Sequence, residues 1–520
     1  MRFPRRAGVL LHPTSFPGRY GVGDLGPGAY AFLDFLAGAG QSLWQVLPLG
    51  PTGYADSPYQ AFSSFAGNPL LINPDRLTAE GYLPAAAVKE TLTFAAGRVD
   101  FGWVIGYKEA LLRRAWDQFR AKGRPAQRRA LEEFNAAEAA WLDDFALFMA
   151  LKGRFKETAG GVWNSWPAAI GRRHKRALNK WRAELAAEVG YYQFQQFLFF
   201  EQWRPLRAYA HAKGIQIIGD VPIFVAFDSA DVWANRELFY LDRGGSPKVV
   251  AGVPPDYFSQ TGQRWGNPLY RWQAMARDDY AWWAARLAAA FRLVDIIRID
   301  HFRGFEAYWE IPADQPTAVV GRWLKGPGAA FFEAMQRRLG ELPIIAEDLG
   351  VITPEVTALR ERFNLPGMKI LQFAFGGERN SDFLPHNFGR NCVVYTGTHD
   401  NETAVGWYLN ADRSEQDHVR RYLARDGSDI AWDLVRLALA STADTAIVPL
   451  QDLMSLGNEA RMNFPGKSGG WWSWRYTRQM LTPFIALRLA EMTELYGRAQ
   501  KEPGSSDALP DSSAGLVPPP

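Results

Sequence analysis

The sequence predicts an α/β protein whose main unit is a (β/α)8 barrel (a TIM barrel), interrupted by a mainly helical insertion and by a second, irregular insertion. Short apolar runs recur along the chain, bounded by turn residues and often separated by stretches with helical spacing. Continuous apolar runs of this kind are typical of parallel strands covered by helices. Eight such runs in chain order favour a barrel of eight parallel strands. The runs are residues 7–13, 42–48, 215–225, 294–302, 342–349, 368–375, 392–400 and 445–453.

The connections between the runs define the expected organisation. A helix-like stretch, PGAYAFLDFLAGAG, separates the first two runs. Residues 84–190 are rich in Ala, Glu, Arg, Lys and Trp with helical spacing, which predicts the helical insertion. Residues 226–280 are rich in Pro, Gly, Asp and Tyr, which predicts an irregular insertion after the third strand. We therefore expect one unit over residues 1–497, with both insertions at the carboxyl ends of the strands. Residues 498–520, rich in Pro, Ser and Gly, predict a disordered tail.

The composition is that of an ordinary globular protein without a strong charge preference. The formal net charge is +3, which gives no drive toward nucleic acid or an anionic membrane. The apolar run 7–11 is shorter than the core of a secretory signal, and no run approaches the roughly 18 apolar residues of a membrane span. The single cysteine, Cys392, predicts a core thiol and fits a reducing compartment. We expect a cytoplasmic protein without nucleic-acid or membrane partners, as a monomer or small homo-oligomer.

Charged and polar side chains gather where the apolar runs end. Arg298 and Asp300 stand two residues apart on the fourth run, so they point to the same face of a strand. The same pattern recurs on other runs, with Asp220, Glu347 and Asp348, His399 and Asp400, and His12. One such pair is compatible with a structural ion pair, but five strands with the same polarity at the same end predict a catalytic site, because barrel enzymes place their catalytic groups there.

The residue types suggest glycoside chemistry. Arg298 should favour the ionised form of Asp300, which suits a nucleophile. Glu347 follows an apolar stretch, where desolvation should favour the protonated form that a general acid needs. Two carboxyl groups with opposed tuning are the requirement of a retaining glycosidase, where they stand about 5–5.5 Å apart. A third acid, Asp400, would bind sugar hydroxyls and help to distort the ring.

Several longer segments carry a resemblance to a known family. The chain resembles the 4-α-glucanotransferases of the amylomaltase type (disproportionating enzymes), glycoside hydrolase family 77, which are related to the α-amylases. The similar segments follow one another over about residues 8–466. They are GVLLHPTSFPG, YGVGDLG, GYADSPYQAFS, GDVPIFV, AGVPPDYFSQTGQRWGNP, IRIDHFRG, IAEDLG, GTHDNET and NEARMNFPG.

The resemblance implies roles for individual residues. It implies that Asp300 is the nucleophile, Glu347 the acid/base and Asp400 the stabiliser of the transition state. It also implies a subsite for the reacting glucose and a loop folded over the cleft; the subsite residues would be Tyr59, Asp220, Arg298 and His399, and the loop residues Gln263 and Trp265. The implied substrates are α-1,4-glucans and maltooligosaccharides. The chain departs from the family pattern at Gly376, where relatives often carry an aspartate, which puts an acidic contact on the acceptor side of the cleft in doubt.

The sequence is compatible with other interpretations of these features. GVGDLG at residues 21–26 fits a dinucleotide motif, but it does not directly follow a strand, and no metal-binding spacing is present, so no cofactor or metal is expected. Most of the 20 tryptophans are expected in a large core, with a cleft for flat sugar faces as the alternative. Tyr59 could be a core aromatic, although SPYQAFS around it matches the family. A starch hydrolase on the same barrel would share the chemistry, with water instead of a sugar hydroxyl attacking the intermediate. A non-catalytic glucan-binding protein would be expected to lack Asp300 or Glu347.

Overall fold

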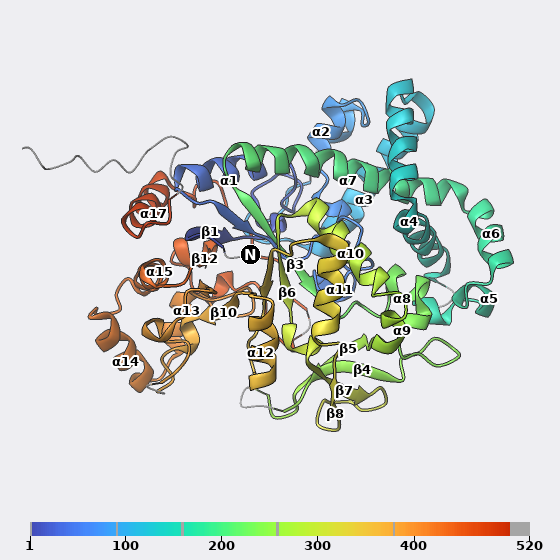
Figure 1. Cartoon of the computed structure of the whole chain (residues 1–520). Helices are drawn as coiled ribbons and strands as arrows, with labels where there is room; N and C mark the ends of the chain where they lie inside the picture. The colour runs from blue at the N-terminus through green and yellow to red at the C-terminus, as the bar shows by residue number, and fades with distance from the viewer. Residues whose placement is uncertain are drawn as a thin grey trace, which may run out of the picture.

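The centre of the molecule is a sheet of eight parallel strands in the order β10-β11-β12-β1-β2-β3-β6-β9 (Figure 1). The computed structural model describes residues 3–89, 92–157, 161–255, 259–377, 380–467 and 469–499. The strands of this sheet are β1 (Arg6–Leu10), β2 (Leu43–Gln45), β3 (Gln216–Pro222), β6 (Ile296–Asp300), β9 (Ile344–Ala346), β10 (Gly367–Ile370), β11 (Cys392–Tyr395) and β12 (Thr445–Pro449).

The first and last strands of this order meet, so the sheet is a nearly closed barrel. Ala346 N at the end of β9 donates to Pro366 O, directly before β10, at 2.9 Å, and Met368 N on β10 donates to Asp348 Oδ1 at 2.7 Å. All eight predicted strands are confirmed. Several predicted runs extend beyond the strand ends, because apolar residues and polar site residues continue into the loops that leave the barrel.

Helices cover the outside of the barrel (Figure 1). They bury their apolar faces against the strands, as in other barrels of this kind. The helices of the barrel and its carboxyl-terminal part are α1 (Pro27–Gly38), α7 (Ala186–Ala212), α10 (Ala281–Leu293), α11 (Ala329–Leu339), α12 (Pro354–Arg362), α13 (Ala404–Asn410), α14 (Arg413–Leu423), α15 (Ile430–Ala440), α16 (Leu450–Leu453) and α17 (Pro483–Leu495), and a short α2 (Pro74–Ala79) follows β2. None of the described helices is long and apolar enough to cross a membrane.

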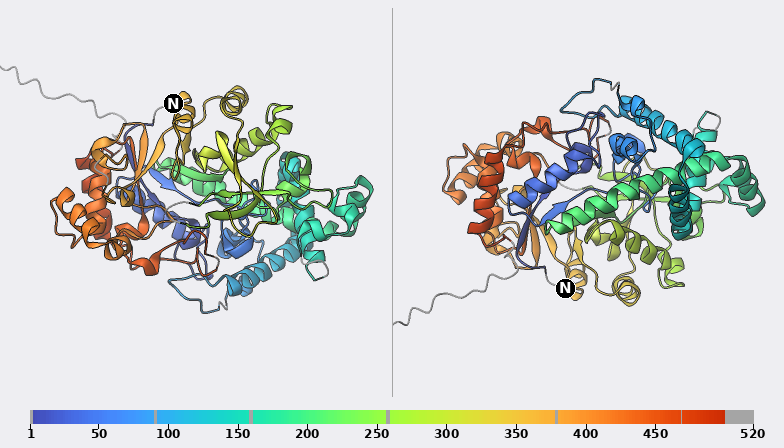
Figure 2. Two further views of the ribbon diagram at one scale, coloured as in Figure 1. Left: turned by 90° about the horizontal axis from the view of Figure 1, so that it is seen from below. Right: turned by 90° about the horizontal axis from the view of Figure 1, so that it is seen from above.

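The insertion over residues 84–190 is mainly helical, as predicted. It contains α3 (Phe101–Lys122), α4 (Pro125–Phe155), α5 (Ala168–Gly171) and α6 (Lys175–Glu184), and it projects to one side of the barrel (Figure 2). Aromatic side chains from these helices and from α7 join the same buried cluster as the barrel, for example Phe148 and Phe194. Large buried rings such as Trp44, Trp203 and Trp283 show that many of the tryptophans are core residues.

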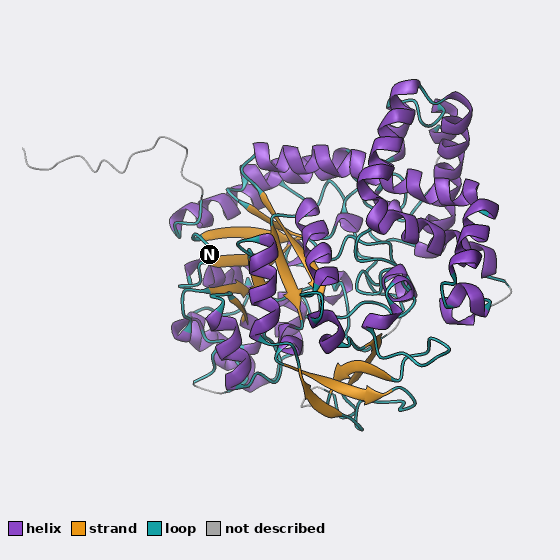
Figure 3. Cartoon of the chain, turned by 45° about the vertical axis from the view of Figure 1, so that its right-hand side comes forward, coloured by secondary structure: helices purple, strands orange, loops and turns teal. Residues whose placement is uncertain are grey.

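The second insertion is more regular than the sequence predicted. Residues 226–280 contain α8 (Ala230–Ala234), β4 (Val249–Val253), β5 (Gln263–Pro268) and α9 (Trp272–Ala276). The two strands combine with β7 (Ala307–Pro312) and β8 (Arg322–Lys325) in an antiparallel sheet of order β5-β4-β7-β8, separate from the barrel (Figure 3). The prediction missed this sheet because half of it comes from a later segment, after β6. Gly252 is needed at its bulge, since a Cβ there would stand 2.1 Å from Gln263 O.

The end of the described chain corrects the expected domain boundary. Arg498, which the sequence placed in the disordered tail, is fully buried. It donates to the main-chain oxygens of Leu439 at 2.8 Å and of Ala443 at 2.9 Å. These bonds satisfy carbonyl groups at and after the end of α15, so Arg498 belongs to the barrel. The rest of the predicted tail, from residue 500, lies outside the described residues.

Candidate active site

The register of β3 and β6 places three charged side chains together at the carboxyl end of the barrel. Asp220 on β3 is the ladder partner of Arg298 on β6, and Asp300 is the last residue of β6. Arg298 Nη1 lies 2.7 Å from Asp220 Oδ2 and 3.0 Å from Asp300 Oδ1. The side chains of Arg298 and Asp220 are buried, whereas that of Asp300 is 31% exposed. Of the two acids that share this arginine, Asp300 is therefore the one that a substrate can reach.

Tyr59 and His399 extend this group. The Tyr59 hydroxyl donates to Asp220 Oδ2 at 2.9 Å and lies 2.9 Å from His399 Nε2, and the two rings stack with centroids 5.2 Å apart. When Tyr59 donates to Asp220, the Tyr59 oxygen can accept from the His399 tautomer that is protonated on Nε2. Burial lowers the pKa of His399, so the imidazole is neutral. The structure thus brings together the four residues expected to line one subsite.

Glu347 follows β9 and has a different environment from Asp300. Its Oε2 accepts from His301 N at 2.7 Å and its Oε1 from Leu349 N at 3.0 Å. Burial first, and then the charge of Asp300, raise the pKa of Glu347 to about 8. A carboxyl group with such a pKa is protonated at neutral pH and can give up its proton when charge develops nearby. This agrees with the desolvation expected from its apolar strand.

The adjacent acid, Asp348, points the other way and has structural partners. Its Oδ1 accepts from Met368 N at 2.7 Å, and its Oδ2 lies 3.1 Å from Arg360 Nε. These contacts join β9 to β10 and α12, at the point where the barrel closes. The alternation of side chains along the strand therefore separates an acid that faces the site from one that holds the barrel together.

Asp400 lies on a turn beyond the end of β11. Thr398 N donates to Asn401 Oδ1 at 2.8 Å, which closes the turn. Asp400 Oδ1 lies 3.4 Å from His399 Nε2 and accepts from Asn463 Nδ2 at 2.6 Å. The Asp400 side chain is 43% exposed, so it is open to solvent. Asn463 was not singled out from the sequence, although it stands in NEARMNFPG, one of the segments that carried the resemblance.

Gln263 and Trp265 come from β5 of the separate antiparallel sheet. Trp265 Nε1 donates to Gln263 Oε1 at 3.1 Å, and the Trp265 ring meets the His301 ring edge to face with centroids 4.8 Å apart. His301 directly follows Asp300 and has a left-handed backbone, with φ 55°. The antiparallel sheet therefore reaches the residue next to Asp300. His301 stands in the IRIDHFRG motif, but no sequence pattern indicates this ring contact.

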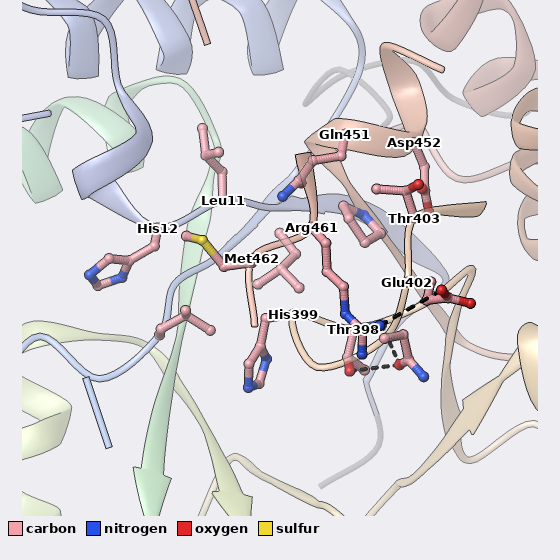
Figure 4. A pocket seen from close by; sticks show the side chains of 14 residues that line it. Leu11, His12, Thr398, His399, Glu402, Thr403, Gln451, Asp452, Arg461 and Met462 are labelled. Carbon is pink, nitrogen blue, oxygen red and sulfur yellow. Dashed lines mark hydrogen bonds and ion pairs between the residues drawn. The ribbon is translucent and has the colours of Figure 1, made fainter. Parts of the chain in front are cut away.

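Small cavities lie behind these side chains. One, of about 20 Å³, lies behind the Asp400 turn and is lined by His12, His399, Gln451 and Arg461 among others (Figure 4). Burial lowers the pKa of His12 to about 3, which makes it a neutral group under the site. Another, of about 70 Å³, is lined in part by Tyr59 and Asp220.

The described residues contain no group of three or more His, Cys, Asp or Glu side chains placed to hold a metal ion. The acids of the site are partnered instead by Arg298, Tyr59, His399, Asn463 and main-chain N–H groups. Cys392 is a buried free thiol. The side chains that surround the reactive acids can therefore bind polar hydroxyls and pass protons.

Comparison with known proteins identifies the family. The model of the 4-alpha-glucanotransferase family matches residues 11–482. The chain belongs to the 4-alpha-glucanotransferase family. It is 54% identical to the 4-alpha-glucanotransferase of Thermus thermophilus, over 95% of this chain and 99% of the relative. It is 50% identical to that of Synechocystis sp., over 95% of this chain and 98% of the relative.

Solved structures agree with this family assignment. The amylomaltase of Streptococcus agalactiae, solved in complex with acarbose, has a TM-score of 0.92 at 40% identity and covers 95% of this chain and 100% of that one. The amylomaltase of Corynebacterium glutamicum, with a TM-score of 0.71 at 18% identity, covers 94% of this chain and 75% of that one, a likeness of fold alone. The predicted family and the predicted barrel are confirmed, and so is the predicted activity of a 4-alpha-glucanotransferase.

Proposed function

We propose that this glucanotransferase works by double displacement through a covalent glycosyl ester on Asp300. In the first half-reaction a carboxylate oxygen of Asp300 attacks the anomeric carbon of the donor glucan. Glu347 gives its proton to the departing 4-oxygen, which leaves as the free end of a shorter glucan. In the second, ionised Glu347 takes the proton from the 4-hydroxyl of an acceptor, whose oxygen attacks the anomeric carbon and releases Asp300. Two inversions give net retention.

The observation that carries this proposal is the contrast between the two acids. Asp300 stands 3.0 Å from a buried arginine and is open to the cleft, whereas Glu347 is buried with a pKa of about 8. A nucleophile must be ionised and a general acid protonated at the same pH. Asp400, partnered by His399 and Asn463, would bind sugar hydroxyls and stabilise the positive charge that develops on the ring.

The remaining site residues form two groups: those that would line the subsite of the reacting glucose, and those that would lie over the bound chain. Tyr59, Asp220, Arg298 and His399 would hold the reacting glucose, since they present a fixed set of donors and acceptors beside Asp300. Gln263 and Trp265 would cover the bound chain from the antiparallel sheet, with the Trp265 ring offering the apolar surface that sugar faces need.

We propose that the substrates are maltooligosaccharides and longer α-1,4-glucans, as donors and as acceptors. The structure of the Streptococcus agalactiae relative in complex with acarbose supports a site for such chains here. Because residue 376 is a glycine, this chain has no acidic side chain at that position to contact an acceptor. The space around it is open, with nothing within 4 Å of a built Cβ.

Incubation with maltotriose tests the proposed reaction. A transferase releases glucose and builds a ladder of longer chains, while the number of reducing ends stays nearly constant. A hydrolase would instead raise the number of reducing ends in proportion to the bonds cleaved. Size-exclusion chromatography with light scattering would check the prediction of a monomer or small homo-oligomer, and cell fractionation would check the predicted cytoplasmic location.

A further inference from the structure

An arginine from a distant segment, Arg461, contacts the turn that carries Asp400. Arg461 donates from Nη2 to the main-chain oxygen of Asp400 at 2.8 Å and from Nε to the main-chain oxygen of Asn463 at 2.7 Å. Asn463 N in turn donates to the main-chain oxygen of His399 at 3.1 Å. One planar guanidinium thus fixes the backbone of the two residues whose side chains meet at 2.6 Å.

Glu402 orients this guanidinium. Its Oε1 lies 3.8 Å from Arg461 Nη1 and accepts from Asn410 Nδ2 and Asn458 Nδ2, both at 2.8 Å. Its main-chain oxygen accepts from Gln372 Nε2 at 2.9 Å. Figure 4 shows Arg461 extended toward the turn after His399, with its head group linked to Glu402. The carboxylate has its own fixed partners, so it can hold the arginine in one orientation.

The barrel alone does not fix Asp400. β11 ends at Tyr395, so the register of the strands no longer determines where a residue on the following turn lies. The side chain of Asp400 is also 43% exposed, so packing alone does not fix it. A charged group must stand close to its productive position, since misplacement by about 1 Å can cost about 10²-fold in rate.

We propose that Arg461, oriented by Glu402, is a positioning residue that sets the place of Asp400 for the stabilisation of the transition state. The inference rests on the proposed role of Asp400. Arg461 directs its donors at main-chain oxygens and at Glu402, so it acts through Asp400 and Asn463. Its loss should lower kcat and leave KM nearly unchanged, because the ground-state contacts of the subsite come from other side chains.

Arg461→Lys is the first test, because lysine keeps the charge but cannot donate from two nitrogens in one rigid plane. We expect kcat on maltotriose to fall about 10-fold to 100-fold with little change in KM. Arg207→Lys is the matched control: Arg207 also donates to two main-chain oxygens and pairs with a carboxylate, but at the start of β6, at the opposite end of the barrel. It should keep wild-type kcat, and thermal midpoints are measured for both.

A double-mutant cycle with Asp400→Asn separates positioning from a general loss of structure. If Arg461 acts through Asp400, Arg461→Lys should change the residual rate on α-glucosyl fluoride by no more than about 2-fold in the Asp400→Asn background. An equal loss in both backgrounds, or wild-type kcat in Arg461→Lys, would overturn the inference. Should Arg461→Lys fail to fold, Glu402→Gln, which keeps an acceptor for both asparagines, decides by the same cycle. Wild-type activity of Asp400→Asn would instead refute the proposed role of Asp400.

Discussion

Asp300 and Asp400 are both acids of one cleft, yet the structure holds them in different ways. Asp300 ends a barrel strand, where the ladder with β3 sets its position and Arg298 contacts it from the same strand face. Asp400 lies on a turn and depends on side chains from a segment after α16. A strand end is positioned by the fold as a whole, whereas a turn residue needs its own set of contacts. Substitutions should therefore act differently at the two places.

The largest effect is expected at Asp300. Asp300→Asn should lower kcat by about 10⁴-fold or more, because an amide cannot form the glycosyl ester. The change is nearly isosteric at a partly exposed position, so the thermal midpoint should stay close to that of the wild type. Steady-state rates on maltotriose together with a melting curve test this. A purified Asp300→Asn protein with substantial turnover would refute the assignment of the nucleophile.

The next effect concerns Glu347 and depends on the donor. Glu347→Gln should lower the rate on maltotriose by about 10²-fold to 10⁴-fold, since the departing sugar needs a proton. An α-glucosyl fluoride leaves without one, so the variant should still form the ester on Asp300 and accumulate it, which mass spectrometry would detect.

Asp348→Asn provides the control for this experiment, because Asp348 has only structural contacts on the other strand face. Asp348→Asn should have a lower thermal midpoint than the wild type. Its ratio of rates on maltotriose and α-glucosyl fluoride should equal that of the wild type. If Asp348→Asn, and not Glu347→Gln, loses activity on maltotriose while it still reacts with the fluoride, the acid/base has been assigned to the wrong residue.

The raised pKa of Glu347 predicts a basic limb in the pH profile. Because the acid form is required, kcat/KM on maltotriose should fall about tenfold per pH unit above about pH 8, and the limb should be absent in Glu347→Gln with the fluoride donor. The free energy of unfolding should depend on pH through the same proton. The folded protein keeps it up to about pH 8, whereas the unfolded chain loses it near the ordinary value of 4.5.

The stabilisation that Glu347 provides is therefore fully present below about pH 4.5 and is lost as the pH rises toward 8. Between about pH 4.5 and pH 8, the thermal midpoint of the wild type should fall relative to that of Glu347→Gln. A midpoint difference that is constant with pH would show that Glu347 titrates normally.

The difference between an acid at the end of a strand and an acid on a turn also explains what the sequence could predict. Apolar runs with polar ends predict Asp300 and Glu347 as site candidates, because strand periodicity sets which face a side chain takes. The separate sheet of β4, β5, β7 and β8 was missed, since strand pairing between segments on either side of β6 leaves no local pattern. Arg498 was placed in the tail because its neighbours are polar and its burial depends on carbonyls at and after the end of α15.

Asn463 belongs to the same class of residues that only the folded chain reveals. The motif that contains it indicated a site segment, but not which of its side chains contacts an acid. Its role follows from one distance, 2.6 Å between Asn463 Nδ2 and Asp400 Oδ1, which depends on two loops meeting in space. Loop-borne partners of this kind are where sequence patterns give least information.

The smallest effect is therefore expected at Asn463, where the contrast between the two acids is sharpest. Asn463→Ala removes one hydrogen bond to a carboxylate that is 43% exposed, so water can replace the lost donor in part. A hydrogen bond to a charged group contributes about 1.5–3 kcal/mol, and we expect the lower end, about 10-fold in kcat, with the backbone bonds of Arg461 still in place. Asn463→Asp should be worse than Asn463→Ala, because a second carboxylate at this distance repels that of Asp400. Asn391→Ala, which removes an exposed contact to Asn364, is the control and should keep wild-type kcat. If Asn463→Ala and Asn463→Asp have equal rates across the pH range, Asn463 does not act through the charge of Asp400.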